Sequence, residues 1–219
     1  MKNRISSLFL VCTMLLLICS SLTGCSSESN ELLKTAKTQY ETDVYQALST
    51  LNTLLENYPE SKAAEEGKPL AKKIIWDTIK SGIILASEAT TYGQDYLDEK
   101  ISEMYAHMFS GTSSNYNFEI DASDSRVVQM IQASQELIQL QTSLNGSKLS
   151  DTVLMEIDIP CLDAMKSFDT VVNYVSKYYS SSMSLHILFS NSLFGTPTSE
   201  KERFDLALST LKSLTPSLS

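Results

Sequence analysis

The side chains that most often carry out catalysis are few in this chain and stand far apart in its sequence. His107 lies off the apolar stripe of a segment with helical periodicity, and His186 lies between Leu185 and Ile187 in an apolar segment. Cys161 falls on the apolar side of its own segment, whereas a nucleophilic thiol needs exposure and positively charged neighbours. We therefore expect His107 on a solvated helix flank, His186 packed or partly exposed, and Cys161 as a buried, inert thiol.

A possible cation site is limited to one polar loop. Glu119, Asp121 and Asp124 cluster there, where they either hold a cation or are simply solvated. The sequence contains no paired cysteines or histidines at zinc-ligand spacing and no calcium loop with its glycine. It also contains no glycine-rich phosphate loop and no nucleophile elbow. We therefore expect no catalytic residue, no metal, no cofactor and no enzyme activity.

One cysteine stands in a motif that predicts a covalent modification. Residues 8–19 form an apolar run behind two basic residues, with the length of a signal-peptide core. This run is too short to span a bilayer core of about 30 Å. The four residues that end at Cys25 (Leu-Thr-Gly-Cys) resemble the lipobox of bacterial lipoproteins. The alternative is an ordinary secretory signal in which Cys25 has no special role.

The lipobox resemblance implies a location and a membrane anchor. In that family the peptide before the cysteine, here residues 1–24, is removed, and the cysteine, here Cys25, is acylated with fatty acids such as palmitate. The chain would then be extracytoplasmic, anchored either on the outer face of the cytoplasmic membrane or in the outer membrane. Its first partner would be the membrane, reached through the lipid on Cys25.

The overall charge excludes two other kinds of partner. The chain has 17 basic and 26 acidic side chains, a formal net charge of −9. Negative charge repels phosphate backbones, so we expect no nucleic-acid partner. It also argues against a polybasic patch for an anionic membrane surface, so anchoring would depend on the lipid. Beyond Cys25 only Cys161 remains, so no intrachain disulfide is expected and an apolar core must supply the stability.

The composition favours helices throughout. Seven glycines and five prolines in 219 residues are too few for a turn-rich β protein or a disordered chain. Apolar periodicity and capping residues then predict about eight to nine helices. They are expected over residues 30–40, after Asp43 up to Pro59, after Ser61, over 70–89, 97–108, 125–144 and 160–179, up to Phe194, and after Ser199.

Two features leave the connections between these helices open to interpretation. Gly67-Lys68-Pro69 is expected to break or kink the chain, because proline lacks an amide hydrogen and clashes with the preceding turn. Gly93 is expected to interrupt it again. Residues 153–159 alternate apolar and acidic side chains like a strand, but a short helix capped by Ser150 also fits.

Residues 44–61 resemble half of a tetratricopeptide repeat. That family places small, bulky and apolar residues and a proline at the spacing of Ala47, Leu51, Leu54 and Pro59. The Tyr-Pro-Glu-Ser ending is similar to the variant found in envelope lipoproteins that help assemble outer-membrane β-barrels. The resemblance covers less than a fifth of the chain, and no second copy follows at the family's period. A generic helical hairpin is the alternative.

These patterns together predict an all-α fold in which a repeat-like helical hairpin stacks on an irregular helical bundle. The expected organisation is a leader at 1–24, a polar tether at 25–29, the hairpin at 30–66 and the bundle domain at 67–219. We expect a lipid-anchored scaffold or adaptor that binds other envelope proteins.

The alternative function is a lipoprotein that binds a small ligand or a peptide in a groove between helices. Tyrosines either mark such a groove or contact surface, or are half-buried at helix edges. They are Tyr92, Tyr96, Tyr174, Tyr178 and Tyr179.

Overall fold

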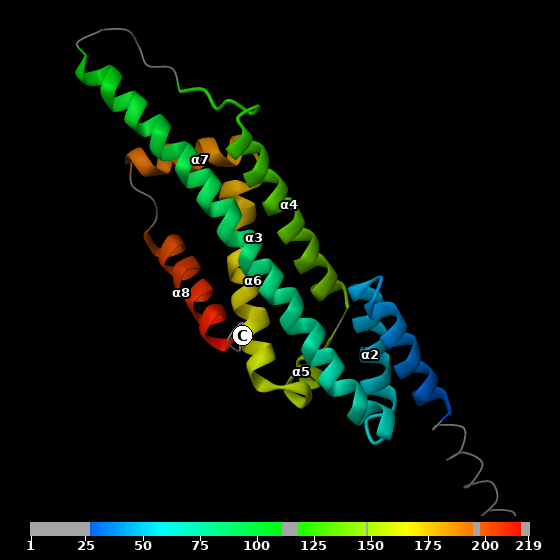
Figure 1. Cartoon of the computed structure of the whole chain (residues 1–219). Helices are drawn as coiled ribbons and strands as arrows, with labels where there is room; N and C mark the ends of the chain where they lie inside the picture. Colours follow the sequence, from blue (N-terminus) through cyan, green and yellow to red (C-terminus); the bar gives the residue numbers. More distant parts are fainter. Residues whose placement is uncertain (1–26, 111–117, 148, 195–197, 216–219) are drawn as a thin grey trace, which may run out of the picture. The chain divides into compact units, whose positions relative to one another are not determined.

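The computed structural model describes residues 27–110, 118–147, 149–194 and 198–215. The described residues form eight helices and no strand, which confirms the expected all-α fold. The first helix covers residues 27–40, so residues 27–29, expected in the tether, are helical. The others in Figure 1 are α2 (Val44–Asn57), α3 (Lys62–Phe109), α4 (Ser125–Gly146), α5 (Asp151–Ile157), α6 (Ile159–Tyr179), α7 (Ser182–Phe194) and α8 (Thr198–Leu214).

The chain divides into two compact units, and one boundary between them falls inside α3. The first unit contains the described residues up to Ile74 together with Gly146–Asp158. The second contains Ile75–Asn145 and the described residues from Ile159 onward. The expected division into residues 30–66 and 67–219 concerns which parts fold on their own, and it stays a prediction. No helix of the described residues has the length and apolar character needed to cross a membrane.

Three helix starts follow the capping signals read from the sequence. The side chains of Asp43, Ser61 and Ser150 each accept a hydrogen bond from the backbone amide three residues later, at 3.0–3.3 Å. Such a side chain satisfies one of the amides that a helix start leaves without a partner. The Ser150 cap begins α5, so of the two alternatives for residues 153–159 the helix is right and the strand is wrong.

The main difference from the sequence expectation is α3, a single helix of 48 residues where three helices were predicted. Pro69 lies inside this helix, and neither the Gly67-Lys68-Pro69 segment nor Gly93 ends it. A proline in a helix interior costs about 3 kcal/mol. Burial of Ala71 and Ile74 just after the proline offsets part of that cost.

The glycines of α3 serve packing rather than chain breaking. A Cβ atom on Gly82 would lie 2.2 Å from the ring of Phe168 on α6. A Cβ atom on Gly93 would lie 2.5 Å from the ring of Tyr179 at the end of α6. Each glycine therefore leaves the space into which an aromatic ring of α6 packs against the α3 backbone.

Within the first unit, the predicted hairpin forms. The small and apolar positions that carried the repeat resemblance, Ala47, Leu51 and Leu54, are fully buried. Gly67 on α3 lies against the side chains of Leu51 and Leu54, which lets the start of α3 approach α2 closely. The hairpin therefore packs on the first turns of α3 through the face that the sequence identified.

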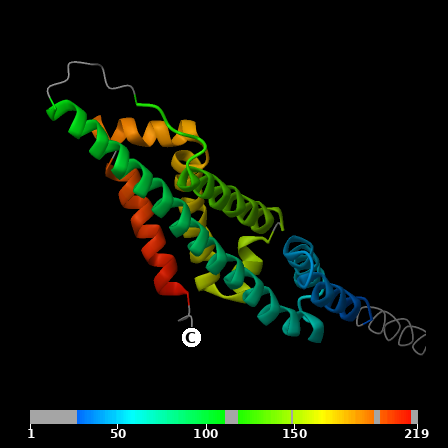
Figure 2. The ribbon, with the colours of Figure 1, turned by 45° about the horizontal axis from the view of Figure 1, so that its top comes forward.

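Within the second unit, α6 is the central element. It packs against α7 and α8, and Figures 1 and 2 show α8 (red) lying along α6 (yellow). One side of α6 is buried along its length, including Phe168, Val172 and Val175. The buried hydroxyl of Ser134 on α4 donates to the carbonyl of Tyr179 at 2.9 Å, which ties α4 to the end of α6.

Candidate functional site

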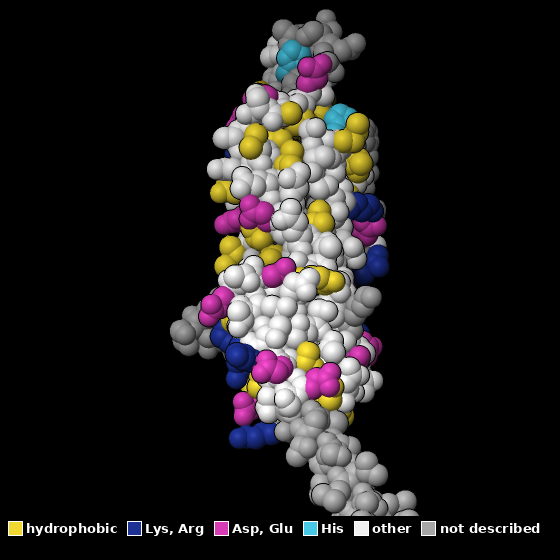
Figure 3. Space-filling view, turned by 90° about the vertical axis from the view of Figure 1, so that its right-hand side faces the viewer, with side chains coloured by type: hydrophobic (Ala, Val, Ile, Leu, Met, Phe, Trp, Pro, Cys, Tyr) yellow, Lys and Arg dark blue, Asp and Glu magenta, His cyan; other side chains and the backbone are white. Residues whose placement is uncertain are grey.

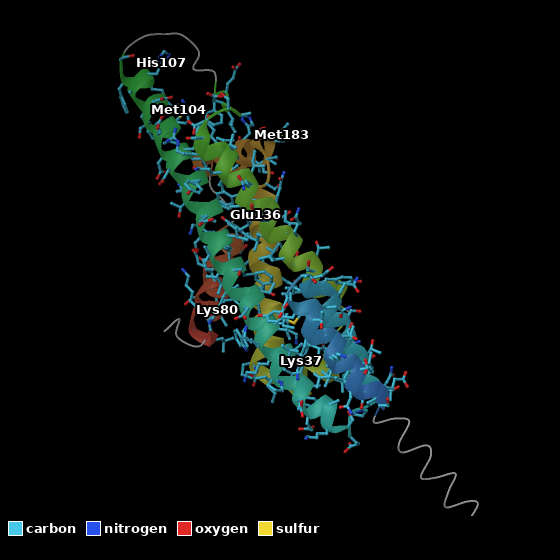
Figure 4. The ribbon with its side chains drawn as sticks, turned by 45° about the vertical axis from the view of Figure 1, so that its right-hand side comes forward. Lys37, Lys80, Met104, His107, Glu136 and Met183 are labelled. Atoms are coloured by element: carbon cyan, nitrogen blue, oxygen red, sulfur yellow. The ribbon has the colours of Figure 1, made fainter. Side chains whose placement is uncertain are left out.

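The structure distributes the potentially reactive residues over separate helices. Cys161 is fully buried in the first turn of α6, as expected. His107 is partly exposed in the last turn of α3 (Figure 4), and His186 is exposed on α7, where its ring stacks on Phe118 at 5.4 Å. Cys25 lies outside the described residues. Among the residues that the structure describes, no group of three or more His, Cys, Asp or Glu side chains could hold a metal ion.

In the acidic loop, Asp124 is paired with an arginine and Asp121 accepts hydrogen bonds, whereas Glu119 is exposed. Arg126 forms ion pairs with Asp124 and Glu99, both at 2.7 Å. Its hydrogen bonds lower the pKa of Asp124 to about 2 and also lower the pKa of Glu99. Asp121 accepts hydrogen bonds from the amide and hydroxyl of Ser123, at 2.8 and 2.6 Å. These partners give Asp121 and Asp124 a structural role at the start of α4.

Four of the five predicted tyrosines are buried, in two groups, whereas Tyr92 on α3 is half-buried. Tyr96 is buried on α3, and its hydroxyl accepts a hydrogen bond from the amide of Asp121 at 2.8 Å. Tyr174, Tyr178 and Tyr179 are buried at the end of α6, where Tyr174 stacks on Phe204 of α8 with ring centroids 4.4 Å apart. Most of these rings therefore belong to the core, and Tyr174 also borders an open groove.

This groove between α6 and α8 is the first candidate binding site. Its volume is about 340 Å³, and Thr170, Asn173, Tyr174, Lys177, Glu200 and Arg203 line it. The carboxylate of Glu200 accepts hydrogen bonds from the Lys177 ammonium at 2.7 and 2.9 Å and from the Tyr178 hydroxyl at 2.6 Å. Those bonds lower the pKa of Glu200 and raise the pKa of Lys177.

The second candidate is an exposed apolar surface at the C-terminal end of α3. The side chains of Tyr105, Met108 and Phe109 are 48%, 64% and 85% exposed. Residues three or four apart share one side of a helix, and the rings of Tyr105 and Phe109 stack with centroids 6.4 Å apart. We call these three residues the α3 stripe. Met104, one turn earlier, is labelled on this end of α3 in Figure 4 and is half-buried.

The α3 stripe contains three exposed apolar side chains at one helix end, whereas α7 carries a pair four residues apart, Met183 and Ile187. On the face shown in Figure 3, hydrophobic side chains lie in small groups with other side chains between them. Scattered apolar side chains are normal on a protein surface, whereas a contiguous exposed cluster marks a contact site. The sequence pattern of residues 97–108 predicted an amphipathic helix, but in the structure only Leu97 of its apolar positions is fully buried.

Sequence reasoning missed the groove because its residues come from two helices. Lys177 and Glu200 are 23 positions apart, and no local motif joins them. Comparison with known proteins adds no further guide, since no family model, no curated protein and no solved structure matches this chain.

Proposed function

We propose that this chain is a lipid-anchored scaffold or adaptor of the bacterial envelope that binds another envelope protein through the α3 stripe. The observation that carries the proposal is the exposure of two aromatic rings and a methionine on one side of a helix end. Aromatic residues and methionine are enriched in the buried centres of protein interfaces. Burying one such side chain stabilises a complex by about 1.5–3 kcal/mol.

The proposed anchor is the lipid on Cys25. The first described helical residue, Ser27, follows Cys25 by two positions, so a lipid on Cys25 would hold the first unit close to the bilayer surface. The lipobox resemblance supports a location outside the cytoplasm, on the cytoplasmic membrane or in the outer membrane. The negative charge of the chain supports a protein partner rather than a nucleic acid.

Site-specific photo-crosslinking in intact cells tests the partner-binding surface. A photoreactive amino acid replaces Met108 in one variant and Leu206 in another. Leu206 is a matched control because it is also an exposed apolar residue, 69% exposed on α8. We expect a discrete adduct from position 108 alone, and we expect Tyr105→Ser with Phe109→Ser to remove it. Equal or absent crosslinking at both positions would reject the α3 stripe as the binding surface.

A second function is favoured by the α6–α8 groove. Small-molecule sites have volumes of about 300–1,000 Å³, and the groove falls at the lower end of that range. In this second proposal the protein binds a small ligand or peptide between helices. A ligand that raises the melting temperature of the isolated protein would support this function, whereas recovery of a stable envelope complex would support the adaptor.

A further inference from the structure

We infer that the α6–α8 groove is a binding site for a small monocarboxylate, with Arg203 as the residue that receives the carboxylate. This inference rests on the second function proposed above and does not depend on the α3 stripe. It follows from how charge is paired along the groove and from which hydrogen-bonding groups remain available there.

Lys177 and Glu200 form an ion pair at one side of the groove. Glu200 accepts three hydrogen bonds, two from Lys177 and one from Tyr178. Glu200 also lies in the first turn of α8, where the helix dipole favours a negative charge. The charges of Lys177 and Glu200 therefore compensate each other, and the pair forms a fixed wall of the groove.

Arg203 follows Glu200 by three residues and therefore lies on the same side of α8. Its Nε donates to the backbone carbonyl of Ser199 at 3.0 Å. Its two Nη groups have no hydrogen bond or ion pair with any residue that the structure describes. Arg126 contrasts with it, because that guanidinium is fully engaged by Asp124 and Glu99.

The groove also contains neutral hydrogen-bonding groups. The side-chain amide of Asn173 has no hydrogen-bond partner among the described residues, and neither does the Tyr174 hydroxyl. A tyrosine hydroxyl carries its proton at neutral pH, so the Tyr174 hydroxyl can donate a hydrogen bond to a ligand. The groove therefore combines a guanidinium whose two Nη groups have no hydrogen-bond partner among the described residues with at least two neutral donors.

Charge balance selects the class of ligand. Lys177, Glu200 and Arg203 together leave one positive charge, which matches a monoanion. A dianionic phosphate would place its second charge near Glu200, which repels it. Two parallel N–H groups of a guanidinium match the two oxygens of a carboxylate. The volume of about 340 Å³ limits the ligand to a small acid.

Ligand-observed ¹⁹F NMR with trifluoroacetate tests this site on the full chain in detergent micelles, with empty micelles as the blank. We expect saturable line broadening that acetate reverses and acetamide, its neutral analogue, does not. Arg203→Gln should weaken binding by about tenfold or more, because it removes a charge-assisted pair of hydrogen bonds. Lys212→Gln, which removes the same charge from the exposed last turn of α8, should leave binding unchanged.

A second variant keeps the test decisive if Arg203→Gln alters the fold. Asn173→Asp adds a negative charge to the groove and should abolish broadening, and the melting temperature of each variant checks that it is folded. Equal broadening by the normal protein and folded Arg203→Gln would overturn the proposal, as would an equal loss in Lys212→Gln. Displacement by inorganic phosphate as effective as that by acetate would reject the monocarboxylate assignment. Crosslinking at Met108 does not involve the groove, so the two proposals can fail separately.

Discussion

Arg126 shows how single side chains fix the turn before α4 in place. Its guanidinium binds Asp124 and Glu99 and lies over the ring of Tyr96, with Cζ 5.2 Å from the ring centroid. The Tyr96 hydroxyl in turn accepts a hydrogen bond from the backbone amide of Asp121. These contacts connect α3 with the loop that leads into α4. They place Asp121 and Asp124, two of the three acidic residues that the sequence left open as a cation site, in a structural network.

Acid should weaken this network in a defined pH range. Arg126 lowers the pKa of Asp124 from 3.8 to about 2 in the folded protein. A lowered pKa means that the contribution of Asp124 to stability is complete above about pH 4 and is lost as the pH falls toward 2. Asp124→Asn should therefore unfold at a lower urea concentration than the normal protein at neutral pH. The difference between the two urea midpoints should shrink as the pH falls toward 2. A difference in urea midpoints that stays constant over this pH range would contradict a stabilising ion pair between Arg126 and Asp124.

Burial of Cys161 leads to a second prediction at this scale. Its side chain is fully buried on α6, so a thiol reagent should modify it far more slowly in the native protein than in denaturant. Peptide mapping by mass spectrometry would separate this site from the other cysteines. Cys161→Ser should lower the stability of the fold, because it replaces a fully buried thiol by a hydroxyl that is more costly to remove from water. Rapid modification of the native protein would instead support a reactive thiol.

The sequence was sufficient to predict side-chain interactions between residues that are close together in the chain. The caps at Asp43, Ser61 and Ser150 were predictable because each side chain bonds an amide three residues away. The ion pair of Arg126 with Glu99 was not predictable, since those residues are 27 positions apart on different elements. The same limit hid the groove, whose charges meet only when α6 and α8 pack together.

At the scale of elements, α3 is where local rules failed. Glycine and proline were read as helix breakers, but a glycine can equally provide the space for a ring that comes from elsewhere in the chain. The rings that fill those spaces, Phe168 and Tyr179, belong to α6, which lies far from α3 in sequence. Nothing near Gly82 or Gly93 in the sequence identifies these partners. Tertiary packing therefore overrides the local propensity.

Gly82→Ala tests this account of α3. In an exposed helix the change would stabilise by up to about 1 kcal/mol. Here the new methyl group meets the Phe168 ring, so we expect a net destabilisation of about 1–3 kcal/mol in urea unfolding. Ser81→Ala, at the neighbouring exposed position, should change stability by less than about 0.5 kcal/mol. In a Phe168→Leu background the cost of Gly82→Ala should shrink, and stabilisation by Gly82→Ala alone would show that the close packing is absent.

At the scale of the molecule, the sequence identified the helix class and the hairpin but not the composition of each unit. The first unit recruits α5, whose residues Val153 and Leu154 are buried, from a segment about a hundred residues further along the chain. The hairpin could be recognised because its small and apolar spacing is local. The recruitment of α5 could not, because it depends on a long-range contact between α2 and α5.

The prediction that the hairpin belongs to a shared core follows at this scale. A single two-helix repeat cannot bury its apolar face alone. A fragment of residues 61–219 keeps α3 with its Ser61 cap but loses the first helix and α2. We expect it to melt at lower temperature than the full chain or to aggregate, because α5 and the first turns of α3 lose their contacts with α2. A monomeric fragment with an unchanged melting temperature would show that the hairpin is an independent module.

We propose that a lipid on Cys25 anchors this helical protein outside the cytoplasm. Metabolic labelling with palmitate, followed by fractionation of the cells, tests that claim most directly. The normal protein should carry the label and sediment with membranes, and Cys161→Ala should behave in the same way, because its cysteine is buried in α6. Cys25→Ala should lose both the label and the mature, membrane-held form. Label that persists on Cys25→Ala, or a normal protein without label, would contradict the account.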